Sequence, residues 1–550
     1  MNHKACLVLL WMAASWAHGQ TRVRKLATNI NHPSINVSAP YVSLDGGTLV
    51  YVSDYGEDNE LILNYTTKKD AVNWRDPQPM QKAVNNRLTF IRGFALNENG
   101  TKMWISSLKG GGLGGYDIHV SELTGQGWSE PRNLGLPVNS KKHDGAPSLT
   151  ADENTMYFMR CETMDRHKAS GCRLMMAKRN YRGVWEEPTE LPAYINTGNS
   201  QVPRILGDGV TLLFSSDKLP GNKGGMDLYE TRFDGIAWSQ PVALAFANTE
   251  KDDQYVSVSS LGRHLMKDQP GMRSTEIVEL LFPEDLKPLS TMKVQGVVKG
   301  VAPSAAYISV FDQVNGRRIF NGQPAADGSF TIFIPEGSCY DLSIEPQEDR
   351  LTYFSKTYDL RGNGFQINDR IEATIAPIRA GDEIELAGIG FKNYTAEISP
   401  TSDEALRRLA RLVKGNPANR FVLDLTYYGY REDSIQSDPD LTEHVIDSSY
   451  LQVLKQVPDS LVADSLEYDS LDLDALQLDS LERDTMITVI IDSLVIRHTY
   501  HNDRSQRQTE AILEALRKDG VDVSKIEMKY RAVPDMPAED RRTMIRLKVR

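Results

Sequence analysis

The sequence predicts a mainly β, multidomain chain: a β-propeller of five blades, with six as the alternative, then a β-sandwich, then an α/β domain with a long acidic insertion. Three observations predict this order. A pattern recurs about every 53 residues in the first half, apolar residues alternate with period two after residue 288, and a β-α-β-α-β-β order begins near residue 380. At roughly 150 residues per domain, 550 residues also predict three to four domains.

The N-terminus has the pattern of a secretory leader. Lys4 precedes an apolar run at 6–14, and Ala17-His18-Gly19 is a small-x-small cleavage pattern before Gln20. We therefore expect residues 1–19 to be a signal peptide. No later stretch reaches the roughly 18 uninterrupted apolar residues that cross a bilayer as a helix, so we expect no transmembrane segment after signal cleavage.

The charge balance argues against nucleic acid as a partner. The net charge is −12, whereas a nucleic-acid binder needs a basic face. Residues 432–484 hold fifteen Asp and Glu against Lys455 and Arg483, so this one stretch accounts for the whole imbalance.

Each copy of the repeat contains the parts of one propeller blade. An Asp-Gly or Asn-Gly turn precedes an apolar strand in most copies, and an aromatic strand ends each of four copies at proline. Four short strands per unit is the composition of a blade. We expect the tryptophans to pack between neighbouring blades. The tryptophan motifs occupy residues 73–77, 127–131, 184–188 and 237–241.

These units resemble the WD40-like (PD40) repeats of TolB-type propellers. The resemblance includes the Asn-Thr element that follows the tryptophan motif, present at Asn196-Thr197 and Asn248-Thr249. The segment 26–31 resembles the end of a blade that lacks its own start. We expect it to complete the fifth blade and close the ring, within a propeller over residues 20–288.

Residues 289–378 are expected to form a small antiparallel β-sandwich. Apolar residues alternate with period two in 294–300, 306–311, 327–334 and 340–344, between turn residues. The order of these segments resembles the carboxypeptidase-regulatory-like, transthyretin-like module. The role that we expect for it is that of a spacer.

Residues 379–550 resemble the OmpA-like C-terminal domain, which binds peptidoglycan. The expected elements are strands at 383–391, 420–426, 526–530 and 543–549 and helices at 401–413 and 507–518.

The residues that bind the ligand in that family are not present at the corresponding positions of this chain. The family holds zwitterionic diaminopimelate with an Asp after the second strand and an Arg on the second helix. This chain has Tyr428 and Gln508 at those positions. Asp503, Arg507 and Arg542 are the candidates that could substitute, and we expect peptidoglycan binding to be weak or lost.

A segment at 430–495 replaces the short link of the family and is expected to be a solvated, acidic, low-complexity insertion. Asp-Ser-Leu or Asp-Ala-Leu recurs every five residues from 459 to 481, a period that places the leucines on no fixed helix or strand face. Weak divalent-cation binding and docking to a basic partner are the alternatives.

Three cysteines remain after leader removal. Cys161 and Cys172 lie between strand-like segments and are the candidate disulfide, with two reduced, partly buried thiols as the alternative. Cys339 is expected to be a core residue.

No motif for catalysis, a cofactor or a metal was found. The chain has no Gly-x-Ser-x-Gly elbow, His-Glu-x-x-His or Gly-Lys-Ser/Thr loop. His498, His501 and Asp503 are close in sequence but are expected to be solvated polar residues. We therefore expect no enzyme activity, no cofactor and no metal.

The combination of modules resembles Bacteroidetes outer-membrane-associated proteins of PorE-type architecture, without their helical repeats and lipidated cysteine. This resemblance implies a periplasmic, outer-membrane-associated scaffold or tether, with envelope proteins bound by the propeller, possible contact to peptidoglycan, and a link to type IX secretion. The alternatives are a pure protein-interaction scaffold with a relic OmpA-like domain, and a propeller hydrolase with its site in the central channel.

Overall fold

The computed structural model describes residues 23–55, 61–85, 93–97, 100–108, 112–165, 168–180, 182–259, 262–362, 367–392, 395–428, 443–458, 486–501, 504–533 and 542–550. It divides into two compact units, residues 1–377 and residues 378–550. The leader expected over residues 1–19 lies outside the described residues. Within those ranges, no helix combines the length and apolar character needed to cross a bilayer.

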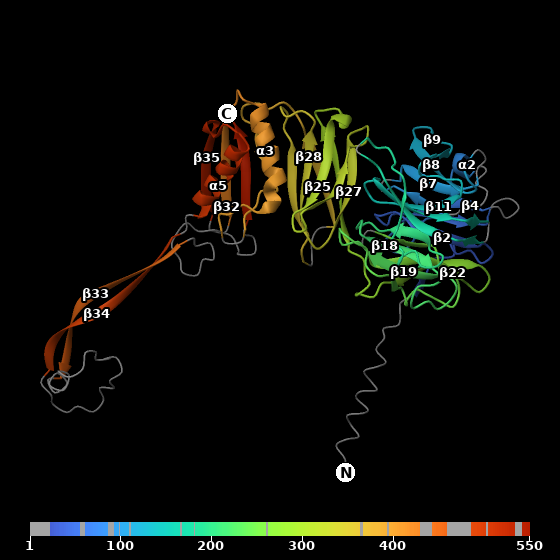
Figure 1. The fold of residues 1–550 in the computed structure, drawn as a ribbon, viewed down its shortest axis with the longest axis horizontal. Coiled ribbons are helices and arrows are strands. Elements are labelled where there is room, and N and C mark those ends of the chain that lie inside the picture. The colour runs from blue at the N-terminus through green and yellow to red at the C-terminus, as the bar shows by residue number, and fades with distance from the viewer. Residues whose placement is uncertain are drawn as a thin grey trace, which may run out of the picture. The chain divides into compact units, whose positions relative to one another are not determined.

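The repeat region of unit 1, residues 23–281, contains five antiparallel sheets, each with four strands in line, which is the number of blades that the repeat predicts. Figure 1 shows the strands of these sheets in blue to green. The first is β2 (Val37–Val42), β3 (Thr48–Ser53), β4 (Ile62–Thr67) and β5 (Gln78–Pro79), followed by the short α2 (Lys82–Asn85). The second is β6 (Phe94–Leu96), β7 (Lys102–Ser107), β8 (Asp117–Thr124) and β10 (Arg132–Asn133), with β9 (Gly127–Trp128) also paired to β8. The third is β11 (His143–Leu149), β12 (Thr155–Cys161), β15 (Arg173–Lys178) and β16 (Thr189–Glu190). The fourth is β17 (Gln201–Ile205), β18 (Thr211–Ser216), β19 (Asp227–Arg232) and β20 (Val242–Ala243).

The fifth sheet joins the two ends of the propeller. It consists of β21 (Val256–Val258), β22 (His264–Pro270), β23 (Thr275–Leu281) and the N-terminal β1 (Val23–Lys25). β1 runs antiparallel to β23, and the N–H of Leu26 donates to the carbonyl of Ile277 at 3.2 Å. The N-terminal segment therefore completes the last sheet and closes the ring, as the partial repeat at 26–31 predicts.

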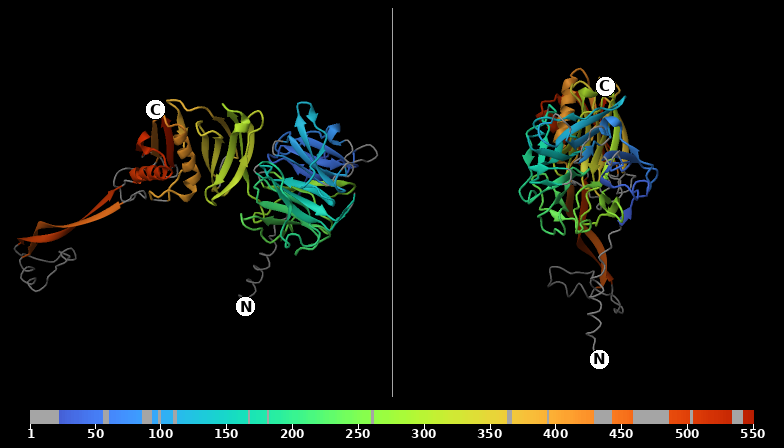
Figure 2. Two further views of the ribbon diagram at one scale, coloured as in Figure 1. Left: turned by 45° about the horizontal axis from the view of Figure 1, so that its top comes forward. Right: turned by 90° about the vertical axis from the view of Figure 1, so that its right-hand side faces the viewer.

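Five apolar clusters fill the spaces between neighbouring sheets. Each cluster draws its buried side chains mainly from two adjacent sheets: first and second, second and third, third and fourth, fourth and fifth, and fifth and first. Because every sheet shares one cluster with each neighbour, the five sheets form a closed ring, and Figure 2 shows these blue to green strands as one body. This ring is a β-propeller.

The repeat tryptophans pack between sheets, as expected. Trp74 belongs to the cluster between the first and fifth sheets, and Trp128, Trp185 and Trp238 pack against the clusters that join their own sheet to the preceding one. Lys68 lies over the ring of Trp74, 4.1 Å from its centroid. A large aromatic residue at this point of each repeat thus fixes one sheet against the next.

One asparagine per sheet hydrogen-bonds the backbone of the third strand. In each case the side-chain amide accepts a hydrogen bond from the N–H of one strand residue and donates one to the carbonyl of the same residue. The asparagine thus satisfies backbone groups that a neighbouring strand would otherwise pair with. The distances are 2.7–3.1 Å, and the pairs are Asn85 with Leu63, Asn139 with Ile118, Asn196 with Leu174, Asn248 with Leu228, and Asn31 with Ile277.

A disulfide joins Cys161, the last residue of β12, to Cys172, with the sulfur atoms 2.04 Å apart. Both residues are fully buried in the cluster between the third and fourth sheets. Between them, β13 (Thr163–Met164) pairs with β14 (Ala169–Ser170). The disulfide therefore closes a small hairpin that projects from the third sheet.

Replacing both Cys161 and Cys172 by serine is expected to lower the free energy of unfolding of unit 1 by about 2–3 kcal/mol, because the disulfide no longer restricts the conformations of the unfolded chain. Urea unfolding of the double variant and the wild type measures the difference. A reductant should lower the stability of the wild type alone. Equal stability of the two proteins under oxidising conditions would contradict the prediction.

A two-sheet sandwich completes unit 1. One sheet has the order β27 (Ser329–Pro335), β24 (Thr291–Lys299), β30 (Asn368–Thr374), and the other β26 (Arg317–Gly322), β25 (Ala306–Asp312), β28 (Cys339–Pro346), β29 (Phe354–Asp359). The side chains between the sheets form one apolar core. The expectation of a purely antiparallel sandwich is wrong at one point, because β24 and β30 are parallel. Between these two strands the chain crosses to the other sheet and returns, and a parallel pair needs such a crossover connection.

Unit 2 combines one mixed sheet with two helices. Its elements are β31 (Glu383–Glu385), α3 (Asp403–Gly415), β32 (Phe421–Tyr428), α5 (Arg504–Lys518), β35 (Ile526–Val533) and β36 (Arg542–Val549), and the strand order is β31-β36-β32-β35. Only β32 and β35 are parallel. α3 buries its apolar side, including Leu409 and Leu412. The strand expected over 383–391 is limited to three residues.

The insertion differs from the solvated stretch that we expected. β33 (Glu443–Pro458) and β34 (Met486–His501) pair along their whole length as a two-stranded antiparallel ribbon. β-branched residues are frequent in 486–496, a strand signal that the neighbouring acidic repeats obscured. The Asp-Ser-Leu repeats at 459–481 lie outside the described residues.

Candidate functional site

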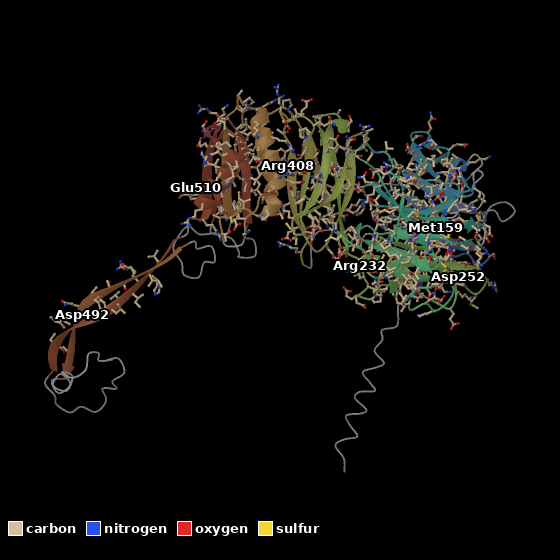
Figure 3. The ribbon with its side chains drawn as sticks, viewed as in Figure 1. Met159, Arg232, Asp252, Arg408, Asp492 and Glu510 are labelled. Atoms are coloured by element: carbon tan, nitrogen blue, oxygen red, sulfur yellow. A yellow bond between two sulfur atoms is a disulfide. The ribbon has the colours of Figure 1, made fainter. Side chains whose placement is uncertain are left out.

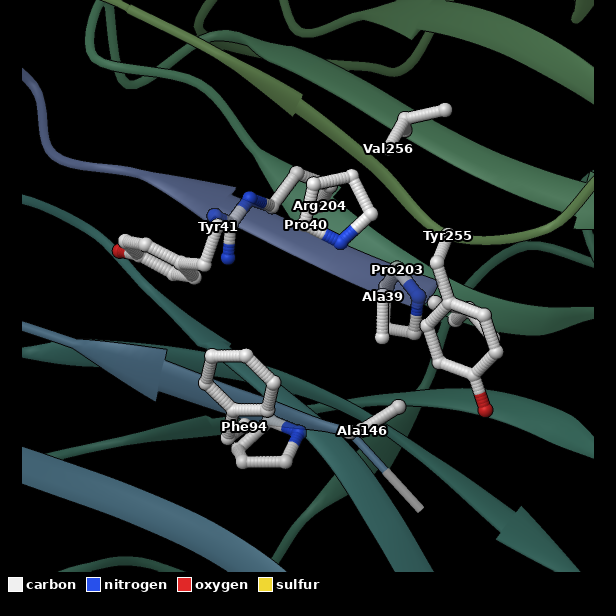
Figure 4. Close-up of a pocket in the computed structure, with 12 residues that line it drawn as sticks. Ala39, Pro40, Tyr41, Phe94, Ala146, Pro203, Arg204, Tyr255 and Val256 are labelled. Carbon is white, nitrogen blue, oxygen red and sulfur yellow. The ribbon is translucent and has the colours of Figure 1, made fainter. Parts of the chain in front are cut away.

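The first strands of the five sheets meet at the axis of the propeller and line a pocket of about 30 Å³ (Figure 4). Each sheet contributes two or three consecutive residues that lie in this strand or directly before it. The lining consists of Ala39, Pro40, Tyr41, Gly93, Phe94, Ala146, Pro147, Val202, Pro203, Arg204, Tyr255 and Val256. A pocket of this size accepts a water molecule or a small end group and not a sugar ring.

The wall of the pocket contains backbone in the left-handed region. Ala39, Ala146 and Val202 have φ of 49°, 47° and 48°, and each precedes a proline. The pairing with the second strand shifts register at the same places. Such a conformation costs about 1–2 kcal/mol for a residue with a side chain and concentrates at functional sites. The recurrence of Ala-Pro or Val-Pro at 39, 146 and 202 is a sequence signal of this wall that the blade pattern of turns and tryptophans does not include.

Gly93 takes the equivalent position in the second sheet. Its φ is 91°, and a Cβ there would lie 2.8 Å from the Cα of Ala146. Only glycine combines this backbone conformation with so close an approach of two inner strands.

Arg204 is the charged residue of the pocket lining. It is 9% exposed, its guanidinium lies 3.5 Å from the ring centroid of Tyr41, and its Nη2 donates to Ser257 Oγ at 3.1 Å. Tyr41 is held in place because its hydroxyl donates to the carbonyl of Leu96 at 2.7 Å. Burial lowers the pKa of Arg204. The pocket thus presents a cation, supported by neutral groups, between aromatic rings.

The lining contains no Asp, Glu or His. Glycoside hydrolysis uses two carboxyl groups on either side of the scissile bond. These twelve residues do not supply that pair.

An ionic cluster supports the pocket wall from the fifth sheet. Lys267 pairs with Asp253, and both side chains are almost completely buried. The next residue, Asp268, accepts a hydrogen bond from the N–H of Ala39 at 2.9 Å. Asp268 therefore holds one of the left-handed residues of the first sheet in place.

Burial raises the pKa of Asp268 to about 6, an effect that the Ala39 N–H and Lys267 oppose. Unfolding returns the group to about 3.9, so the folded state binds the proton more tightly and loses stability as the pH rises from about 4 to about 6. An Asp268→Asn variant should therefore gain stability relative to the wild type over this interval. Urea unfolding of the variant and the wild type at about pH 4 and about pH 6 measures the difference in stability between the two proteins. The same difference at both pH values would contradict the prediction.

A larger hollow of about 440 Å³ lies within unit 1 between the third and fourth sheets and the sandwich. Four carboxylates line it: Asp152, Asp208, Asp312 and Glu336. Each accepts a backbone N–H in a turn or at a strand end, as Asp208 does from Thr211 at 2.9 Å. Its volume is within the range of small-molecule sites.

The candidate peptidoglycan residues of unit 2 are not brought together by described contacts. Asp503 lies outside the described residues, and only the backbone of Arg542 is described, opposite Tyr428 in the β36–β32 pairing. Arg507 is exposed on α5. Gln508, at the position of the family arginine, is buried and its Nε2 donates to the carbonyl of Thr395 at 2.8 Å. Gln508 is therefore a packing residue.

Within the ranges that the structure describes, no group of three or more His, Cys, Asp or Glu side chains could hold a metal ion. Of the three polar residues considered for such a group, His498 lies on β34, and His501 and Asp503 have no described side chain.

Comparison with known proteins returns solved structures only. No protein-family model matches the chain, and no curated protein matches it. The solved structures include a TolB protein from Agrobacterium tumefaciens (15% identity, 57% of this chain and 98% of that one, TM-score 0.29). They also include an endo-arabinase from Bacteroides thetaiotaomicron (16%, 48% and 99%, 0.34) and an α-L-arabinofuranosidase from Lactobacillus brevis (11%, 47% and 95%, 0.32).

These comparisons correct one expectation and leave others as predictions. The expectation of no enzyme activity is withdrawn, because glycoside hydrolases are among the matching structures and enzyme activity is therefore not excluded. The OmpA-like and PorE-type parts of the resemblance stay predictions. The chain is a mainly β protein whose first unit carries a propeller with TolB and glycoside hydrolase structures among its neighbours.

Proposed function

We propose that the chain is a cell-envelope scaffold whose propeller binds a partner protein through the axial pocket. Its place would be the periplasmic side of the outer membrane, with unit 2 contacting peptidoglycan or a second protein, and with a link to type IX secretion. The leader pattern at 1–19 and the buried disulfide support export to an oxidising compartment.

The observation that carries the proposal is the environment of Arg204. A buried guanidinium that rests on Tyr41 and Ser257 keeps donors for a planar anion, and a carboxylate satisfies them with two parallel hydrogen bonds. A carboxylate also fits a pocket of about 30 Å³. The ligand class that follows is an acidic side chain or the C-terminal carboxylate of a partner protein.

Calorimetric titration of the mature chain with short peptides tests this proposal. Peptides that end in a free carboxylate should bind, and the same peptides with an amidated end should not. Arg204→Met should weaken binding about 10- to 100-fold, the range expected for hydrogen bonds to a charged group. Arg204→Lys keeps the charge but loses the planar fork, so an intermediate affinity is expected. With peptides that lack Asp and Glu, equal binding of the free and amidated forms would exclude the C-terminal carboxylate as the ligand. If peptides with an internal Asp or Glu also bind the wild type and Arg204→Met equally well, the proposal is refuted.

Unit 2 needs a separate experiment, because its contact could be peptidoglycan or protein. Co-sedimentation of the mature chain with purified sacculi, compared with Arg507→Ala, distinguishes a tether from a relic domain. Binding that depends on Arg507 supports the tether. No binding by the wild type supports the alternative, a pure interaction scaffold. A Gln508→Arg variant, which would restore the arginine of the family, does not help to distinguish these outcomes, because it would place a charge in the buried contact with Thr395.

Hydrolysis is a second candidate function, and the 440 Å³ hollow favours it, because a sugar ring fits there beside several carboxylates. The assay measures the release of nitrophenol from a panel of nitrophenyl glycosides. Asp208→Asn and Asp312→Asn retain turn-capping oxygens but remove the charge. If either carboxylate is catalytic, its variant should lose at least about 100-fold in rate. Absence of turnover by the wild type on a broad panel would exclude this candidate.

A further inference from the structure

One face of the ribbon of unit 2 carries most of the large apolar side chains that are at least half exposed on it. Directly opposed residues of β33 and β34 share a face, and so do residues two apart on one strand. One face therefore carries six large side chains, each 50–74% exposed, and we call it the apolar face: Ile446, Tyr450, Leu454, Ile490, Leu494 and Ile496.

The opposite face is less apolar among the side chains that the structure describes. Its aliphatic residues are Val445, Leu451, Val453 and Val495, which are 37–55% exposed. It also carries Asp447 directly opposite Arg497. On the apolar face the titratable side chains that are described, Asp492 and His498, both belong to β34. On β33 the large apolar side chains of this face alternate with the uncharged Ser448 and Gln452. Figure 3 shows Asp492 on this two-stranded element.

Isolated two-stranded ribbons are marginally stable in water, and a soluble chain rarely exposes so many large apolar side chains together. We propose that the apolar face is an interface between two copies of this chain, packed face to face about a two-fold axis. This inference does not depend on the function proposed for the propeller.

The area available matches what a dimer needs. Six side chains that are at least half exposed present on the order of 100 Å² each, so two copies bury on the order of 1,000 Å², the size at which specific interfaces begin.

The face is also complementary to itself. Ile446 and Leu454 lie four residues on either side of Tyr450. A two-fold axis beside Tyr450 therefore packs Ile446 of one copy on Leu454 of the other, with β33 antiparallel to its equivalent.

Charge selects this antiparallel arrangement. The residues that connect β33 to β34, 459–485, contain nine Asp and Glu and one Arg. Antiparallel ribbons direct these two acidic segments to opposite ends, whereas parallel ribbons would bring like charges together. The same negative charge disfavours an anionic lipid surface as the occupant.

Sedimentation equilibrium of the mature chain, at a protein concentration on the order of 10 µM, tests the proposal. The wild type should have close to twice the mass of one chain. Tyr450→Asp with Leu454→Asp should have the mass of one chain, because the substitutions place charges in the apolar face of both copies. The matched control is Leu451→Asp with Val453→Asp, which puts two charges on the opposite face of the same strand and should remain a dimer.

Several results would overturn the proposal. A monomeric wild type excludes the dimer, and its flotation with phosphatidylcholine vesicles, or its binding to an alternating Lys-Leu peptide, would name lipid or a basic apolar protein as the occupant instead. If both double variants remain dimers, another surface holds the copies together. If both become monomers, the ribbon as a whole is needed and the assignment to one face is wrong.

Discussion

Replacing Lys267 by methionine is expected to lower the free energy of unfolding of unit 1 by about 3–5 kcal/mol. The side chain is 2% exposed, and its Nζ contacts the carboxylate of Asp253 and the carbonyl of Ala247, the latter at 2.8 Å. Methionine fills a similar volume, so the loss comes from the Asp253 charge that stays buried without its partner. Urea or thermal unfolding of the purified variant measures the difference.

A second variant separates the ion pair from simple packing. Lys267→Met combined with Asp253→Asn removes both charges, while Asn keeps an acceptor for the Thr249 N–H, which now donates to Asp253 at 2.6 Å. This double variant should recover most of the lost stability, because removing a whole buried pair is often nearly neutral. A double variant as unstable as the single one would assign the effect to packing.

Replacing Asn196 by alanine is expected to cost about 3 kcal/mol or more. Its amide accepts from the N–H of Leu174 at 2.7 Å and donates to the carbonyls of Leu174 and Leu191, each at 3.1 Å. These backbone groups are buried, so each loses its partner without access to water, at about 1–3 kcal/mol per group. Denaturant unfolding measures the loss.

The control for Asn196 is an asparagine outside this network. Asn73 lies exposed in a turn and hydrogen-bonds Asp70, so Asn73→Ala should change the stability by no more than about 0.5 kcal/mol. Equal effects of the two substitutions would show that the five-fold asparagine pattern does not stabilise the propeller.

The propeller was predictable because its signals are local and repeated. Turn glycines, Trp74 and its equivalents, and the Asn196 element recur in most of the units, so the strand order of one sheet predicts that of the next. The ribbon was missed because residues 443–458 and 486–501 pair across an acidic segment, and no local pattern gives that pairing.

The axial pocket was also missed, for a different reason. Arg204 becomes exceptional only when the ring brings Tyr41 and Ser257, from two other sheets, against it. A single arginine in a strand carries no such signal. The Ala-Pro and Val-Pro pairs that shape the wall were visible, yet their left-handed conformation follows from the register shift between paired strands.

Arg204 and Lys267 are both buried cations near the axis, but only Lys267 pairs with a carboxylate in the described structure. If Arg204 serves a ligand, its charge costs stability in the free protein, since residues kept for function are often unfavourable for folding. The most direct measurement is the unfolding free energy of Arg204→Met in the absence of ligand. We predict a stability equal to or above that of the wild type. A loss of 2 kcal/mol or more, comparable to that of Lys267→Met, would show that Arg204 is a structural residue and contradict the binding pocket.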